Sequence, residues 1–264
     1  MSAGKSIRLA QLLRRDGRTF IGALDVFMPR GPLPGLRDPA ATARIFVEAG
    51  ADALLLHEGL VDVCLPSFIG RIAIVVKLTT ASWGAQDTTR RVQVTSVRRA
   101  VSLGASAVAV NCFLGVPHDT QLLRQLGRIS EECSEYGMPL IPLINPNPQH
   151  QFDADHVAYV CRAGAELGGD IVKSDYPGSP DALARAVNMC PRPLIIEESP
   201  LPLTPEGTLR TVAGVLEAGG AGVMFAHRIW DAPQPPSQSH SSLRMREATP
   251  ATSRRRHLFG QLTS

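Results

Sequence analysis

The sequence lacks any apolar run close to the roughly 20 residues that a membrane-spanning helix needs, so we expect no membrane association. Its five cysteines are scattered without a Cys-x-x-Cys pair, which argues against a disulfide framework and indicates a reduced, cytoplasmic protein. The net charge of +3 is too small to indicate a nucleic-acid-binding groove. The first 17 residues carry no apolar core of the signal-peptide type and instead predict a first helix.

Lysine is also scarce. Of the 27 basic residues only Lys5, Lys77 and Lys173 are lysines. Two of them, Lys77 and Lys173, lie in strongly apolar runs, where arginine would be the default cation of this chain. A lysine amine can lose its proton and attack a carbonyl carbon, which a guanidinium cannot do. The retention of lysine at these two positions therefore indicates amine chemistry.

Short apolar runs rich in Val, Ile and Leu alternate with longer helical patterns, as in βα units whose parallel sheet is covered on both sides. The expected strands are Thr19–Leu24, Ala53–Leu56, Ile72–Leu78, Ala107–Asn111, Leu140–Ile144, Ile171–Lys173, Leu194–Ile196 and Gly222–Phe225. The expected helices are Pro39–Ala49, Thr89–Leu103, Asp119–Tyr136, Asp153–Leu167, Ser179–Asn188 and Pro205–Ala218, with poorer definition around residues 60–70. A length of 264 residues suits one barrel domain, which typically needs about 250.

A repeated junction supports the barrel. EAGADALLL, SLGASAVAV, ELGGDIVKS and EAGGAGVMF each place glycine between a helix and the following strand, where a left-handed C-cap is needed. The rival fold, an open doubly wound sheet, would favour a Gly-x-Gly-x-x-Gly motif after the first strand, and this sequence has none. We predict an α/β fold, a single-domain (β/α)₈ TIM barrel over residues 1–230. Residues 231–264, rich in Pro, Ser and Arg, predict a flexible C-terminal tail.

In such a barrel the active site lies at the C-terminal ends of the strands. Polar residues follow the apolar strands at these positions: Asp25, His57, Glu58, Lys77, Asn111, Asn145, Lys173, Glu197, Glu198, His227 and Arg228. The sequence has no HxxxH, HExxH or close Cys/His cluster, so we expect no metal, although His57, Glu58 and His227 could converge in space.

Lys173 is the strongest candidate for a nucleophile that attacks a carbonyl carbon. To attack a carbonyl, its amine must be neutral, which requires a pKa lowered from about 10.4 by burial or by a nearby cation such as Lys77 or Arg228. The resulting iminium would stabilise the carbanion made when a C–C bond breaks. The alternative is a structural lysine paired with an acid such as Asp175 or Glu197.

Other candidate residues have two possible roles, one in the chemistry and one in the fold. Asp25 could shuttle protons during carbinolamine formation and dehydration, or it could cap a loop. Tyr176 could present its hydroxyl to the site, or it could pack in the core. His57 and Glu58 could bind substrate hydroxyls.

Several stretches resemble the archaeal-type class I fructose-bisphosphate aldolases and their relatives in the DeoC/FbaB superfamily. The most specific are ALDVFMPRGP, VVKLTT, AVSLGASAVAV, GMPLIPLINP and GGDIVKSDYPGS, and the likeness extends from about Gly17 to Trp230. The resemblance implies a barrel, Schiff-base chemistry without cofactor or metal, and a homo-oligomer. It implies that Lys173 forms the imine and that Asp25 is the aspartate after the first strand.

The chain departs from this family at three places. Val26 stands where the family usually has histidine, and Asn145 where it commonly has a catalytic tyrosine, whose acid role asparagine cannot take. Glu197 and Glu198 replace the Gly-Gly pair of the family's phosphate site, and Ala226-His227-Arg228 replaces its Gly-Arg-Asn run. Two carboxylates would repel a phosphate, because unit charges 4 Å apart interact by about 4 kcal/mol at an effective dielectric near 20.

We therefore predict a lysine-dependent aldolase, a lyase that makes or breaks a C–C bond in a small carbonyl compound other than a standard sugar bisphosphate, in a biosynthetic setting. One alternative keeps the iminium but carries out acyl transfer, condensation or dehydration. The other is a non-catalytic barrel that binds a metabolite.

Overall fold

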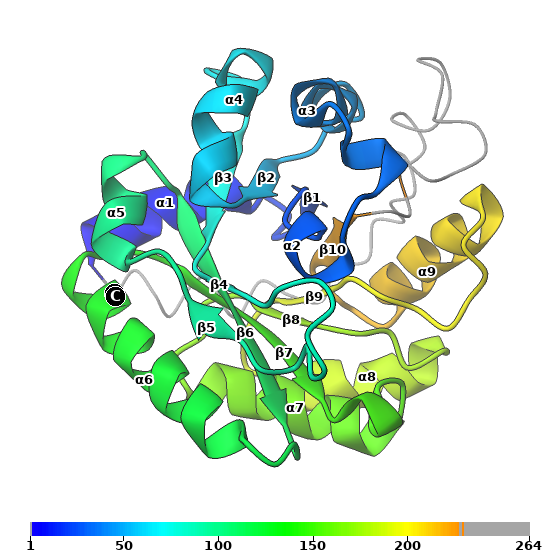
Figure 1. The fold of residues 1–264 in the computed structure, drawn as a ribbon. Helices are drawn as coiled ribbons and strands as arrows, with labels where there is room; N and C mark the ends of the chain where they lie inside the picture. The colour runs from blue at the N-terminus through cyan, green and yellow to red at the C-terminus, as the bar shows by residue number, and fades with distance from the viewer. Residues whose placement is uncertain (1, 227–228, 230–264) are drawn as a thin grey trace.

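The computed structural model describes residues 2–226 and 229. Eight parallel strands close into a barrel in the order β1-β10-β9-β8-β7-β6-β3-β2, with helices around it (Figure 1). The barrel strands are β1 (Thr19–Ala23), β2 (Ala53–Leu56), β3 (Ala73–Lys77), β6 (Ala107–Leu114), β7 (Leu140–Pro146), β8 (Val172–Ser174), β9 (Leu194–Ile196) and β10 (Gly222–Phe225). The predicted (β/α)₈ fold is confirmed. The predicted tail, residues 231–264, lies outside the described residues, so the boundary near residue 230 stays a prediction.

The strands are buried along their length because helices cover the outside and side chains fill the inside. Every residue of β1, β2, β8 and β9 is buried, and in β2 and β9 this explains an unbroken run of Ala, Leu and Ile. The core is one cluster that runs through all eight strands and the inner faces of the helices. This leaves the strand ends as the place where polar side chains can converge.

The surrounding helices are α3 (Pro39–Glu48), α4 (Glu58–Phe68), α5 (Val97–Ser102), α6 (Asp119–Glu135), α7 (Ala154–Glu166), α8 (Pro180–Met189) and α9 (Pro205–Glu217). Several begin at a side chain that caps the backbone, such as Asp38 before α3 and Thr204 before α9. The predicted glycines follow α3, α5, α7 and α9 with positive φ, for example Gly104 (77°) and Gly219 (81°). None of the helices in the described part of the chain is long and apolar enough to cross a membrane.

The two ends of the barrel differ. Helix α1 (Ala3–Leu12) is the predicted first helix, and it packs across the N-terminal ends of the strands, where Lys5 Nζ lies 2.9 Å from Asp170 Oδ2. The short α2 (Phe27–Arg30) and the 3₁₀ turns η1 (Pro34–Leu36) and η2 (Pro148–His150) belong to loops that follow the C-terminal ends of the strands. In Figure 1 α2 lies over this open end of the barrel.

One predicted helix is wrong in its first half. Residues 89–96 do not join the helix, and α5 starts only at Val97. Instead, β4 (Thr79–Thr80) and β5 (Val92–Gln93) form a small antiparallel pair outside the barrel. The β-branched residues of TTRRVQVT favour an extended chain over a helix. The pair holds the loop between β3 and α5 beside the C-terminal end of the barrel.

Candidate active site

A cavity of about 170 Å³ opens among the C-terminal ends of the strands. It is lined by Asp25, Val26, Pro29, Arg30, Lys77, Arg91, Asn111, Phe113, Leu143, Asn145, Pro146, Pro148, Gln151, Lys173, Asp175, Glu197 and Glu198. Seven predicted site residues are in this set: Asp25, Lys77, Asn111, Asn145, Lys173, Glu197 and Glu198. The cavity is smaller than the roughly 300–1,000 Å³ typical of pockets for drug-sized ligands, which suits a small substrate.

On one wall Asp25 and Lys77 form a buried ion pair. Lys77 ends β3, Asp25 follows β1, and Lys77 Nζ donates to Asp25 Oδ2 at 2.6 Å. Burial would raise the pKa of Asp25, but the Lys77 ammonium and its hydrogen bond hold that pKa below its usual value. Asp25 is therefore an anion near neutral pH and can accept a proton.

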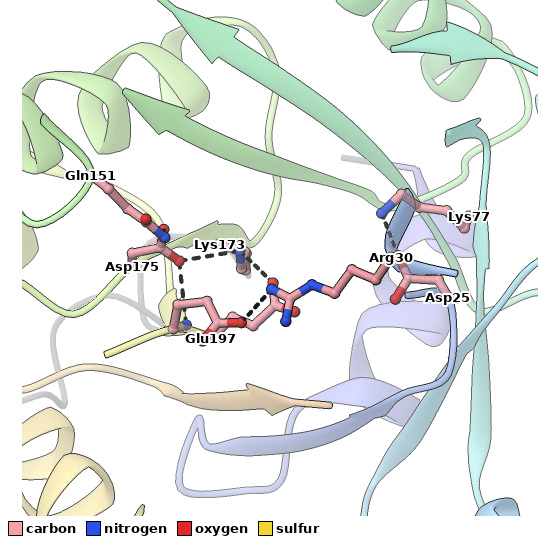
Figure 2. Close-up of polar contacts among 8 residues, drawn as sticks. Asp25, Arg30, Lys77, Gln151, Lys173, Asp175 and Glu197 are labelled. Carbon is pink, nitrogen blue, oxygen red and sulfur yellow. Dashed lines mark hydrogen bonds and ion pairs between the residues drawn. The ribbon is translucent and has the colours of Figure 1, made fainter. Parts of the chain in front are cut away.

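On the opposite wall Lys173 projects from β8 between two carboxylates (Figure 2). Its side chain is 2% exposed, and Nζ lies 2.5 Å from Glu197 Oε2 and 3.5 Å from Asp175 Oδ1. Burial would lower the pKa of Lys173, yet the attraction of Glu197 and Asp175 outweighs burial and raises it. Our expectation of a lowered pKa is thus wrong for this arrangement, because the groups nearest the amine are anions. Lys77, expected as a lowering cation, is instead paired with Asp25.

Asp175 is held firmly in place. Gln151 Nε2 donates to its Oδ2 at 2.9 Å, and the backbone N–H of Glu198 donates to its Oδ1 at 3.3 Å. Figure 2 shows Gln151, Asp175 and Lys173 grouped on the same side of the cavity. These two hydrogen bonds hold the Asp175 carboxylate beside Lys173. The contact of Lys173 with Glu197 is nevertheless the shorter one, 2.5 Å against 3.5 Å.

Glu197 and Glu198 have different partners. Burial raises the pKa of Glu197 above its usual value, although the Lys173 ammonium opposes this. A carboxylate with a raised pKa in contact with an ammonium can take up the proton of that ammonium. Glu198 accepts a hydrogen bond from Arg30 Nη2 at 2.9 Å, and Figure 2 shows the Arg30 side chain reaching across from the side of Asp25.

Among the lining residues that the sequence does not identify as site residues, four have charged or amide side chains: Arg30, Arg91, Gln151 and Asp175. Asp175 was expected only as a structural partner of Lys173. Arg30 and Gln151 lie in loops after β1 and β7, and Arg91 lies just before β5. Long loops after barrel strands indicate that some of their residues border the active site. Which of these residues turn inward depends on tertiary packing.

Two predicted residues lie away from the cavity, each in contact with an outer helix. Glu58 is the first residue of α4 and points away from the site, since Arg99 Nε donates to its Oε1 at 2.5 Å. Tyr176 is 2% exposed and packs on α9, where a Cβ added to Gly214 would lie 2.3 Å from its hydroxyl oxygen. For Tyr176 this position agrees with the packing alternative. A substrate-binding role for Glu58 and a catalytic role for Tyr176 stay predictions that the cavity lining does not support.

His57 lies beside the site without lining the cavity. Burial lowers its pKa below the usual value, although the neighbouring Asp25 carboxylate acts in the opposite direction. Its Nε2 is enclosed and has no hydrogen-bond partner among the described residues. A substrate-binding role for His57 stays a prediction. His227 and Arg228 lie outside the described residues.

Two other features of the described chain do not add to the site. No group of three or more His, Cys, Asp or Glu side chains in the described part is arranged to hold a metal ion. A wider, open depression lies at the opposite end of the barrel, where Arg14 and Asp52 are paired at 2.7 Å. Asp52 also accepts a hydrogen bond from the backbone N–H of Phe20 at 2.8 Å, so its carboxylate stabilises the fold at this end of the barrel.

Residues 12–232 match the family described as DeoC/LacD family aldolase. An uncharacterised aldolase of Saccharolobus solfataricus is 31% identical over 246 residues, covering 88% of this chain and 90% of the relative. The 2-amino-4,5-dihydroxy-6-oxo-7-(phosphonooxy)heptanoate synthase of Streptomyces griseus is 27% identical over 235 residues, covering 88% of this chain and 86% of that enzyme.

Among solved structures, an archaeal fructose-1,6-bisphosphate aldolase is similar over most of the barrel. It is 27% identical, with a TM-score of 0.78, over 91% of this chain and 96% of that one. In that structure the catalytic lysine is covalently bound to the carbinolamine intermediate of the substrate.

Proposed function

This chain belongs to the DeoC/LacD family of aldolases and is a class I, Schiff-base-forming lyase, and we propose that Lys173 is the lysine that captures its carbonyl substrate. The observation that supports this assignment is a buried amine that faces a cavity and touches a carboxylate able to take its proton. Among the three lysines of the chain, Lys5 lies at the far end of the barrel and Lys77 is bound to Asp25.

We propose that Glu197 activates Lys173. In the resting site the amine holds the proton, so the first step moves that proton from Nζ to the Glu197 carboxylate. The freed electron pair of Nζ then attacks the carbonyl carbon, and the carbonyl oxygen takes a second proton from the attacking nitrogen to become the hydroxyl of a carbinolamine. Glu197 returns its proton to this hydroxyl, which leaves as water and gives the iminium. This is the acid–base role that Asn145 cannot take.

Asp25 is placed for the step at the C–C bond. The iminium draws the electron pair of the bond between the α and β carbons toward nitrogen, which gives an enamine. Breaking that bond requires the loss of the proton on the β-hydroxyl. Asp25 lines the same cavity on the opposite wall from Lys173, and its lowered pKa keeps it ready to accept this proton. Lys77 holds the carboxylate in position.

The substrate we propose is a small carbonyl compound other than a sugar bisphosphate. The Streptomyces griseus relative is named for a phosphorylated product, but Glu197 and Glu198 of this chain line the cavity after β9. Glu197 is paired with Lys173 and Glu198 with Arg30, so the two nearest cations already have carboxylate partners. A phosphate placed against them would face two carboxylates, which disfavours binding on this side of the barrel.

Borohydride trapping tests the assignment. The protein is incubated with hydroxyacetone or dihydroxyacetone, reduced with borohydride, digested and mapped by mass spectrometry. With only three lysines in the chain, an adduct can be placed without ambiguity. We expect it on Lys173, and we expect it to vanish in Lys173→Met and to persist in the control Lys5→Met. An adduct on Lys77 would contradict the assignment.

The ion pairs of Lys173 favour one competing function. A lysine held by Glu197 and Asp175 is also what a structural role would require, in a barrel that binds a metabolite without turnover. The two differ in one result: a metabolite-binding barrel would give no trapped adduct with any carbonyl compound, and Lys173→Met would mainly lower its stability.

Two further proposals concern the setting of the enzyme. A cytoplasmic location agrees with the cysteines, all five of which are buried and free. A homo-oligomer follows from the family resemblance alone, and light scattering of the purified chain tests it.

A further inference from the structure

Arg91 stands out in the mouth of the cavity. It precedes β5, and its guanidinium carbon lies 5.6 Å from the centre of the Phe113 ring. Its Nε is enclosed by the protein and has no hydrogen-bond partner among the described residues. Its neighbour Arg90, by contrast, is exposed to solvent. A buried donor without a partner costs free energy, so its retention indicates that a ligand completes the contact.

The ion pairs in the cavity also single out Arg91 as a residue that can bind a ligand. Four cations and four carboxylates line it. Lys77 is paired with Asp25, Lys173 with Glu197, and Arg30 with Glu198. Of the cavity-lining cations in the described chain, Arg91 alone forms no ion pair within 4 Å. Burial lowers its pKa, partly offset by Asp25 and Glu197, but arginine stays charged in proteins.

Strand register places Arg91 relative to the reactive amine. Leu143 of β7 is registered with both Asn111 of β6 and Lys173 of β8, so these three residues form one layer of the barrel. Phe113 is registered with Asn145, two residues further along each strand, and this forms the next layer toward the mouth. The guanidinium that packs on Phe113 therefore lies above the layer of Lys173.

We propose that Arg91 binds an anionic group of the substrate, a carboxylate or a phosphate, on a carbon chain that extends from the imine at Lys173 toward the mouth. This inference rests on the proposed function of Lys173. A guanidinium recognises either group through paired N–H donors, and it does so best where water is excluded. The anion then lies on the side of β6 and β7, away from Glu197 and Glu198.

Two neighbouring amides fit the same substrate. The Oδ1 atoms of Asn111 and Asn145 are buried and have no hydrogen-bond partner among the described residues. They lie on adjacent strands, one in each of the two layers. Hydroxyl groups along a chain that joins the imine to the anion would supply the donors that these oxygens lack.

The first test measures anion binding without imine chemistry. Inorganic phosphate and malonate are titrated calorimetrically into the wild-type chain and into Arg91→Met, Arg91→Lys and the matched control Arg90→Met. We expect Arg91→Met to weaken binding by about 10- to 100-fold, the loss of a charge-assisted hydrogen bond, and Arg90→Met to leave it unchanged. Arg91→Lys should restore part of the affinity. Equal affinities of wild type and Arg91→Met, or no binding to wild type, would overturn the proposal. The tighter of the two probes identifies the anion class.

The second test separates this inference from the function of Lys173. Borohydride trapping is titrated with levulinate and its uncharged methyl ester, and with dihydroxyacetone phosphate and dihydroxyacetone. Arg91→Met should raise the half-saturating concentration of an anionic ketone by about 10-fold or more while leaving its neutral counterpart unchanged. Trapping of neutral ketones on Lys173 without this difference refutes the role of Arg91 alone. A lack of trapping with the neutral ketones refutes the function of Lys173, while the calorimetric result still decides the anion site.

Discussion

Glu197 Oε2 lies 2.5 Å from Lys173 Nζ, and the two residues come from adjacent strand ends of the barrel. A lysine nucleophile is often described as activated by burial or by a neighbouring cation. Here the nearest groups are anions, and the pKa of Lys173 is raised. Activation must therefore come from a proton acceptor in direct contact, and the raised pKa of Glu197 makes this carboxylate suitable.

This relationship predicts a specific defect in Glu197→Gln. The amide cannot accept the proton of Lys173 or return one to the carbinolamine, so we expect kcat to fall by about 10²- to 10⁴-fold, the usual contribution of a general acid–base. The ammonium also loses its closest counter-ion, which favours the neutral amine. The yield of borohydride-trapped imine at equilibrium should accordingly stay near that of wild type, and only its rate of formation should fall.

Rapid-quench trapping and steady-state kinetics together check this prediction. Glu131→Gln, an exposed position on α6, is the matched control and should leave both quantities unchanged. A loss of equilibrium imine in Glu197→Gln, with no slowing of its formation, would contradict the role assigned to Glu197.

The buried pair of Asp25 and Lys77 predicts a stability effect. Lys77→Met removes the partner of a carboxylate that is only 8% exposed, so we expect the free energy of unfolding to fall by about 3–5 kcal/mol. The double variant Asp25→Asn, Lys77→Met carries no uncompensated charge and should recover much of that loss. Urea unfolding of both variants provides the measurement. A double variant no more stable than Lys77→Met would show that packing, not charge, accounts for the loss.

The same pair predicts how stability depends on pH. In the folded chain the pKa of Asp25 is lowered, so the pair stabilises the protein above the unfolded-state pKa of about 3.9. As the pH falls below this value, the unfolded chain takes up a proton that folded Asp25 resists. Without Lys77, burial raises the pKa of folded Asp25, so the folded variant takes up a proton at a higher pH than folded wild type does. The stability advantage of wild type over Lys77→Met should therefore be largest where Asp25 is ionised in both chains, and it should shrink as the pH falls through the raised pKa of the variant toward the lowered pKa of wild type. An advantage that does not change between pH 6 and pH 3 would contradict this account.

Much of the fold could be predicted because its signals are local. Apolar runs set the eight strands to within a few residues, and glycine at the helix ends set the junctions. The error at residues 89–96 arose where the chain pairs with Thr79–Thr80 in a contact that no local period reveals. A helix over these residues would also place Arg91 outside the loop that borders the cavity, so its position there does not follow from the sequence.

The site could be predicted in part for a related reason. Residues at strand ends, such as Asp25, Lys77 and Lys173, point inward because the strand itself directs them. Loop residues such as Arg30 and Gln151 reach the cavity through tertiary packing, which the sequence does not display. The charge state of Lys173 was missed since it depends on the distances to Glu197 and Asp175, and these follow from the rotamers chosen in the folded barrel.

Tyr176 provides the final prediction, which concerns the difference between nearness in sequence and nearness in space. It lies three residues after Lys173, yet its ring is buried against α9. Tyr176→Phe should therefore leave kcat within about two-fold of wild type, which is less than the 10²-fold effect expected for a catalytic acid.

Gly214→Ala, in contrast, would place a methyl group 2.3 Å from the hydroxyl oxygen of Tyr176 and should lower the free energy of unfolding by about 1–3 kcal/mol. Because the next ring atom lies 3.0 Å from that methyl position, the same alanine should cost less in a Tyr176→Phe background. A double-mutant cycle by urea unfolding measures this coupling. Additive effects would contradict the contact between the hydroxyl and position 214, and a large loss of kcat in Tyr176→Phe would place the hydroxyl in the active site.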